Sequence, residues 1–135
     1  MSKYMLDTNI CIYLIKNKPE TVYTNIQKHN FEDMCISSIT YAELCYGVEK
    51  SNYVERNRVA LTLMMSRLKI VDFDTKASEC YGKIRSDLEK KGTPIGPLDM
   101  LIAAHAKSLD CIVVTNNEKE FKKVSNIMVE NWTNK

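Results

Sequence analysis

The chain has 135 residues, of which 44% are hydrophobic and 27% charged, and its formal net charge is +2. This composition is ordinary for a globular protein, and the length leaves no room for a second core, so we expect one domain over residues 1–135. The small net charge neither indicates nor excludes a nucleic-acid-binding protein, because acids gathered into a site leave the remaining surface more basic.

Cysteine and histidine usage argues against a zinc site. The five cysteines are widely spaced and form no C-x-x-C pair, and the two histidines, His29 and His105, lie near no cysteine pair. We expect buried thiols in a reducing compartment. No apolar signal region begins the chain and no apolar run is long enough to span a membrane, so a cytoplasmic protein is expected.

Apolar patterning predicts strands that alternate with helices along the whole chain. Strands are expected over 4–6, 34–36, 70–71, 111–114 and 127–129. Helices are expected after Asp7, over 21–29, from Ser37-Ser38 to about Val48, and over 54–68, 74–90, 98–108 and 117–122. Asp74 or Thr75 caps the helix that stops at Gly92. The continuous apolar run 111–114 is typical of a central parallel strand buried on both faces.

This alternation predicts an α/β/α sandwich with a mainly parallel sheet of four to five strands. Ligands of such sheets bind beyond the carboxyl ends of the strands. Asp7 and the Thr115-Asn116-Asn117 segment each follow a predicted strand, and Glu43 lies less than two turns into the helix that follows another. Asp99 opens the helix that begins after Pro97.

Each acid also has a purely structural explanation. Asp7 is a plausible helix cap, Thr40-x-x-Glu43 has the spacing of a capping box, and Asp99 suits the first turn of a helix. Glu118 and Glu120 read as solvated charges. Taken together, however, these acids fall at one edge of one sheet, and gathered carboxylates repel one another unless a cation neutralises them. Oxygen ligands suit Mg²⁺ or Mn²⁺, so the sequence predicts metal-assisted phosphodiester hydrolysis.

Four motifs, in order, carry a family resemblance over essentially the whole chain. They are Met5-Leu6-Asp7-Thr8-Asn9, the segment Ser37–Leu44 with Gly47, the segment Pro94–Ala106, and Val113–Phe121. With them the chain resembles the PIN-domain ribonuclease toxins of the VapC type, from VapBC toxin–antitoxin pairs.

The resemblance implies a PIN-like fold and a Mg²⁺-dependent endoribonuclease, a hydrolase that cuts RNA and inhibits translation. The expected substrate is a tRNA anticodon loop, with initiator tRNA as one target. Asp7, Glu43 and Asp99 would be the catalytic acids, with Asp7 and Asp99 holding the metal ion. A VapB-type antitoxin, a homodimer and a larger toxin–antitoxin complex are the implied partners, with no membrane.

The chain departs from the family pattern at its fourth acid. Position 117 is Asn rather than Asp, with Glu118 and Glu120 nearby. Glu120 is favoured because it directly precedes Phe121. Thr115, Asn116 and Asn117 would be polar helpers at the substrate, and Arg85 would meet a phosphate or lie on a solvated helix face.

Two further features bear on partners and alternatives. The helix over 54–68 is apolar on more than one face, which predicts either a partner surface or a helix buried on two sides. His105 is expected to be a packed or capping residue. Asn117 supports one alternative function, a catalytically weak PIN-like module that acts through a DNA-binding partner. A phosphoryl-accepting receiver explains Asp7 but not Glu43 with Asp99.

Overall fold

The computed structural model describes residues 3–16 and 18–133, and within them five strands and seven α-helices alternate. The strands are β1 (Tyr4–Leu6), β2 (Met34–Ser37), β3 (Lys69–Val71), β4 (Ile112–Val114) and β5 (Val129–Glu130). The helices are α1 (Thr8–Lys16), α2 (Glu20–Ile26), α3 (Ser38–Glu49), α4 (Val54–Met65), α5 (Thr75–Lys91), α6 (Pro97–Ser108) and α7 (Glu118–Phe121). A 3₁₀ turn at Phe31–Asp33, which the sequence pattern did not predict, precedes β2.

All strand pairs in the sheet are parallel, and the strand order is β3-β2-β1-β4-β5. β1 therefore lies in the middle, where Met5 is in register with Cys35 on one side and Val113 on the other. Because every strand runs the same way, the segments that follow β1, β2 and β4 emerge at one edge. The predicted α/β fold with a parallel sheet is confirmed.

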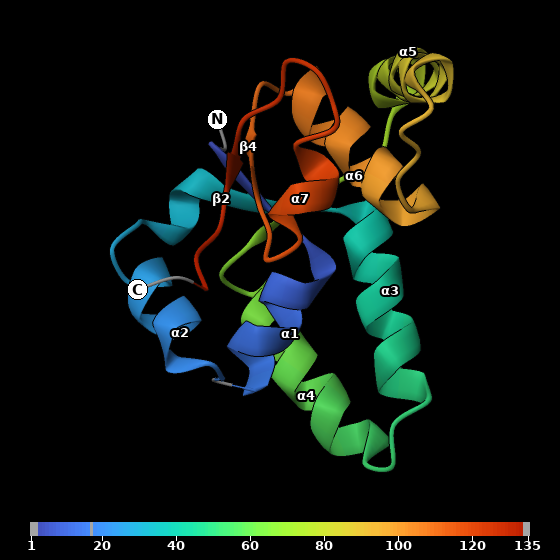
Figure 1. Cartoon of the computed structure of the whole chain (residues 1–135). Helices are drawn as coiled ribbons and strands as arrows, with labels where there is room; N and C mark the ends of the chain where they lie inside the picture. The colour runs from blue at the N-terminus through green and yellow to red at the C-terminus, as the bar shows by residue number, and fades with distance from the viewer. Residues whose placement is uncertain (1–2, 17, 134–135) are drawn as a thin grey trace.

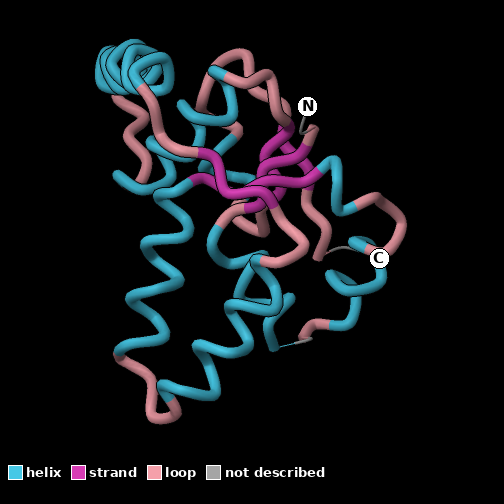
Figure 2. Tube along the Cα trace, turned by 180° about the vertical axis from the view of Figure 1, so that it is seen from behind, coloured by secondary structure: helices cyan, strands magenta, loops and turns pink. Residues whose placement is uncertain are grey.

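Side chains of the strands alternate between two cores, as the pleat requires. Tyr4 and Leu6 pack with residues of α1 to α4, whereas Met5 and Val113 pack with residues of α5, α6 and α7. Figure 1 shows these two groups of helices on opposite sides of the sheet, and Figure 2 shows the sheet between them from behind. The sandwich holds the strand edge rigidly because both of its faces are covered.

Helix caps follow local chemistry, with one correction to the sequence prediction. Oδ1 of Asp74 accepts a hydrogen bond from Ala77 N at 3.0 Å, and Gly92 ends α5 with φ of 67°. The capping-box explanation of Thr40-x-x-Glu43 is wrong, because Ser37 is the cap of α3 and its Oγ accepts from Ile39 N at 3.1 Å. Glu43 lies in the second turn, where no backbone N–H needs it.

The apolar helix α4 is buried on one side only. Leu61 is 5% exposed, whereas Val59 and Leu63 are 58% and 65% exposed. The interpretation of a helix buried on two sides is therefore wrong for this chain on its own. Among the described residues, no helix combines the length and apolar character needed to cross a lipid bilayer.

Candidate active site

Asp7 joins two neighbouring strands at the carboxyl edge of the sheet. It follows β1 and is 4% exposed, and Thr115, which follows β4, donates a hydrogen bond from Oγ1 to Asp7 Oδ2 at 2.5 Å. The other oxygen, Oδ1, accepts from Ile10 N at 3.0 Å and so caps α1. The cap explanation for Asp7 thus holds alongside its place at the edge, and both bonds fix the carboxylate.

Asp99 lies at the same edge of the sheet, on α6, which belongs to the helical layer opposite α1. It lies in the first turn of α6, two residues after Pro97, and its Oδ2 accepts a hydrogen bond from Asn117 Nδ2 at 3.2 Å. The backbone N–H of Asn117 in turn donates to Thr115 Oγ1 at 2.9 Å. A continuous chain of hydrogen bonds therefore runs from Asp7 through Thr115 and Asn117 to Asp99.

The three acids Asp7, Glu43 and Asp99 face one pocket of about 220 Å³. Glu43 approaches it from the second turn of α3, and Leu98 and Ile102 supply an apolar wall. Apart from Asp7, which directly precedes α1, the residues that line the pocket belong to α1, α3 and α6, and Figure 1 shows how these helices are arranged around the sheet. The apolar wall was not predicted, although the i,i+4 spacing of Leu98 and Ile102 around Asp99 is a signal for it.

Burial makes this pocket unfavourable for negative charge. Desolvation raises the pKa of Asp7 from 3.8 to about 6, against hydrogen bonds from Thr115 and Ile10 that lower it, and the charge of Asp99 adds to the rise. Burial also raises the pKa of Asp99, which the Asn117 bond opposes and the charge of Glu120 reinforces. A cation in the pocket would reverse these shifts, because it favours the ionised form of each carboxylate.

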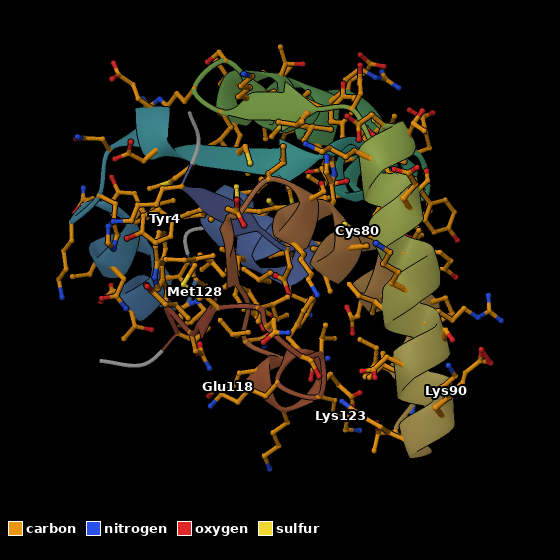
Figure 3. The ribbon with its side chains drawn as sticks, turned by 90° about the horizontal axis from the view of Figure 1, so that it is seen from above. Tyr4, Cys80, Lys90, Glu118, Lys123 and Met128 are labelled. Atoms are coloured by element: carbon orange, nitrogen blue, oxygen red, sulfur yellow. The ribbon has the colours of Figure 1, made fainter. Side chains whose placement is uncertain are left out.

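The two candidates for the fourth acid point to different neighbours. Glu120 contributes negative potential at Asp99, and its own carboxylate lies 3.4 Å from Lys123 Nζ. Glu118 accepts a hydrogen bond at 3.2 Å from Nδ2 of Asn131, which directly follows β5, and its carboxylate lies 3.4 Å from Lys122 Nζ. Figure 3 labels Glu118 on the outer side of α7. Electrostatic coupling to Asp99 therefore distinguishes Glu120 from Glu118.

The carboxylates line one pocket but do not form a complete set of metal ligands. In the described ranges, 3–16 and 18–133, no three His, Cys, Asp or Glu side chains gather closely enough to hold an ion alone. The oxygen donor set nevertheless fits a hard cation that keeps part of its water shell. Asp7 and Asp99, both raised in pKa by burial, are the residues that such an ion would relieve.

The remaining predicted site residues are distributed unequally. Thr115 and Asn117 belong to the chain of hydrogen bonds, whereas Asn116 donates from Nδ2 to the Tyr13 hydroxyl at 2.8 Å. Arg85 does not line the pocket. Its partners are on its own helix: it donates a hydrogen bond to the Tyr81 hydroxyl at 3.1 Å and forms an ion pair with Glu89 at 3.6 Å.

Comparison with known proteins matches residues 4–127 to the PIN domain family model. The chain is 50% identical over 132 residues to a tRNA(fMet)-specific endonuclease VapC of Salmonella typhimurium, covering 98% of this chain and 99% of the relative. It is 48% identical to a ribonuclease VapC2 of Rickettsia felis, covering 96% and 97%. The VapBC crystal structure from Salmonella typhimurium, bound to DNA, superposes with a TM-score of 0.92 over 98% of this chain and 99% of that one.

Proposed function

We propose that this chain, which belongs to the PIN-domain family and within it to the VapC ribonucleases, hydrolyses RNA as the toxin of a toxin–antitoxin pair. The observation that carries the proposal is the convergence of Asp7, Glu43 and Asp99 on one pocket at the carboxyl edge of the sheet. Three acids from three different helical segments have no shared structural duty there, and a bound cation gives them one.

The nuclease is metal-dependent, as PIN-domain nucleases are, and we propose Mg²⁺ as the ion, with Mn²⁺ as a substitute. Asp7 and Asp99 would hold it, and Glu43 and Glu120 would act from further away. When bound, such an ion supplies charge neutralisation at the phosphate and makes water more acidic. An incomplete protein shell suits this role, since Mg²⁺ keeps waters and takes further ligands from substrate phosphates.

The protein's own residues orient the reaction. Thr115 and Asn117 hold the carboxylates of Asp7 and Asp99 by hydrogen bonds, so neither has to reorganise when RNA arrives. Glu43 accepts a hydrogen bond and a proton from the attacking water. The water oxygen bonds to phosphorus as the bond to the 3′ oxygen breaks. The departing 3′ oxygen takes a proton from solvent water, which leaves a 5′-phosphate and a 3′-hydroxyl.

We propose a tRNA as the substrate, cut in its anticodon loop. The Salmonella typhimurium relative is named for tRNA(fMet), and its 50% identity over nearly the full length supports initiator tRNA as the first target to test. Exposed loops present unstacked nucleotides that can reach a pocket at the edge of the sheet. Loss of that tRNA would inhibit translation in the cytoplasm, where we expect the protein to act.

The partners we propose are a VapB-type antitoxin and a second copy of the chain. Matching solved structures are VapBC complexes, which supports an antitoxin. The exposed Val59 and Leu63 on α4 offer apolar surface that a partner would cover. A homodimer inside a larger toxin–antitoxin complex follows from the family resemblance.

The function is tested by sequencing 5′-phosphate RNA ends after brief induction, with the Asp7→Asn variant as control. We expect new ends within tRNA anticodon loops for the wild type only. New ends that are equally abundant with Asp7→Asn, or their absence from the wild type, would contradict the proposal.

A further inference from the structure

A second hollow, of about 360 Å³, lies between α5, α6 and the segment 122–126. Its polar lining comes from all three elements: Lys83 and Asp87 on α5, Lys107 on α6, and Ser125 and Asn126 on the segment after α7. None of these residues lines the carboxylate pocket. The hollow is therefore separate from the carboxylate pocket, and α6 is the helix that contributes residues to both.

The hollow carries positive charge that ion pairs among the described residues do not neutralise. Asp87, its acid, is paired with Lys91 at 3.0 Å, and Lys91 also donates to Ser125 Oγ at 2.8 Å. Within the part of the chain that the structure describes, neither Lys83 nor Lys107 takes part in an ion pair. Two unpaired ammonium groups beside a hydroxyl and an amide form a set of donors suited to phosphate oxygens.

The hollow lies along the helix that also carries Asp99. Lys107 follows Asp99 by eight residues in α6, which separates them by about 12 Å along the axis. The segment after α7, which lines the hollow, is also linked to Glu120, because Lys123 Nζ lies 3.4 Å from the Glu120 carboxylate. The Lys91–Ser125 hydrogen bond joins the end of α5 to the segment after α7, and Figure 3 labels Lys90 and Lys123 on these two segments.

We propose that this lysine hollow binds backbone phosphates of the RNA substrate while the bond to be cut lies at the carboxylate pocket. The proposal rests on the ribonuclease function proposed above and adds to it a binding surface outside the reacting centre. Lysine contacts to phosphate supply affinity and orientation without reading bases. The acidic pocket alone repels a polyanion, so a neighbouring cationic surface gives the substrate a place to bind.

The test compares two double variants in an Asp99→Asn background, which permits binding to be measured without cleavage. Lys83→Gln/Lys107→Gln removes the two unpaired charges from the hollow. Lys28→Gln/Lys69→Gln removes the same net charge elsewhere, since Lys28 follows α2 in the opposite layer and Lys69 lies on edge strand β3. The probe is purified initiator tRNA, titrated with Mg²⁺ fixed and monovalent salt varied.

We expect the hollow variant to bind tRNA more weakly and to lower the slope of log K against log salt by about 1 for each lysine removed. The control should keep the parent's slope. Equal affinity and slope in the two double variants would overturn the proposal.

Cleavage by the same lysine variants with Asp99 intact separates this proposal from the function itself. We expect a raised KM and an unchanged kcat for Lys83→Gln/Lys107→Gln. A normal KM, with cleavage still lost in Asp7→Asn, would overturn the lysine hollow and leave the ribonuclease assignment standing. Wild-type protein that binds tRNA through these lysines without cutting it would support the hollow and overturn the ribonuclease assignment.

Discussion

The side-chain amide of Asn117 donates a hydrogen bond to Oδ2 of Asp99 at 3.2 Å. The amide lowers the pKa of Asp99, whereas a carboxylate there would raise it. The bond therefore keeps Asp99 closer to its ionised form before a metal ion arrives, and it fixes the direction in which the second oxygen points.

Replacing Asn117 by Asp exchanges this donor for a second negative charge. We expect Asn117→Asp to unfold at a lower temperature than the wild type in metal-free buffer, because the two carboxylates repel. It should bind Mn²⁺ more tightly by calorimetry, because the ion gains an oxygen ligand. Unchanged metal-free stability together with unchanged Mn²⁺ affinity would show that position 117 does not adjoin the ion.

Asp7 makes the stability of the metal-free protein depend on pH. Its pKa is about 6 in the folded protein and 3.8 ordinarily, so between these values the folded state binds more protons than the unfolded state. The free energy of unfolding should therefore fall as pH rises from about 4 to about 7, by at most about 3 kcal/mol. Urea unfolding across this range measures it.

Asp7→Asn is the control for that pH series, since it lacks the titrating carboxyl. Burial of His105 lowers its pKa and makes stability fall at low pH, but both proteins retain His105 and its effect cancels in the comparison. Saturating Mg²⁺ should flatten the wild-type difference, because the ion favours ionised Asp7. Parallel pH profiles for the two proteins in metal-free buffer would contradict the assignment.

Glu120 and Glu118 offer a matched pair for the fourth acid. Glu120→Gln removes negative potential from Asp99 and should weaken Mn²⁺ binding and slow tRNA cleavage. Glu118→Gln should leave both unchanged, since Glu118 bonds Asn131 and pairs with Lys122. A larger effect of Glu118→Gln on Mn²⁺ affinity would contradict the assignment of Glu120 as the fourth acid.

His105 is a structural residue in this account. It is 1% exposed, its Nδ1 lies 2.8 Å from Ser37 Oγ, and its ring packs edge-on against Phe73. We expect His105→Leu to lower the free energy of unfolding by about 1–3 kcal/mol, because the buried Ser37 hydroxyl loses its contact with the ring and keeps only the hydrogen bond from Ile39 N. Cleavage measured well below the melting temperature should persist, and its complete loss in a folded variant would assign His105 to the chemistry.

Local patterns were enough to predict the elements and the edge. The apolar, β-branched run ending at Val114 identified β4, Asp74 and Gly92 marked the ends of α5, and a parallel sheet requires Asp7 and Thr115 to share an edge. These features depend on short-range chemistry or on a general rule of sheet topology. The fold class could therefore be predicted from the amino-acid sequence.

Contacts between segments far apart in the sequence could not be predicted from local patterns. The bond from Asn117 to Asp99 depends on how α6 packs against the segment after β4, and no local pattern specifies it. Arg85, which the family resemblance suggested for a phosphate contact, instead contacts Tyr81 and Glu89 four residues away on its own helix, and its distance from the pocket depends on how α5 packs. The exposure of Leu63 likewise depends on which face of α4 meets α1 and α3.

The most direct test of the central claim is the single-turnover rate at which purified protein cleaves initiator tRNA in Mg²⁺, compared between wild type and Asp99→Asn. We expect a loss of about 100-fold or more in the variant, because it lacks a carboxylate that we propose to hold the cation. Circular dichroism confirms that the variant is folded. A folded Asp99→Asn protein that cuts the tRNA at the wild-type rate would contradict the account.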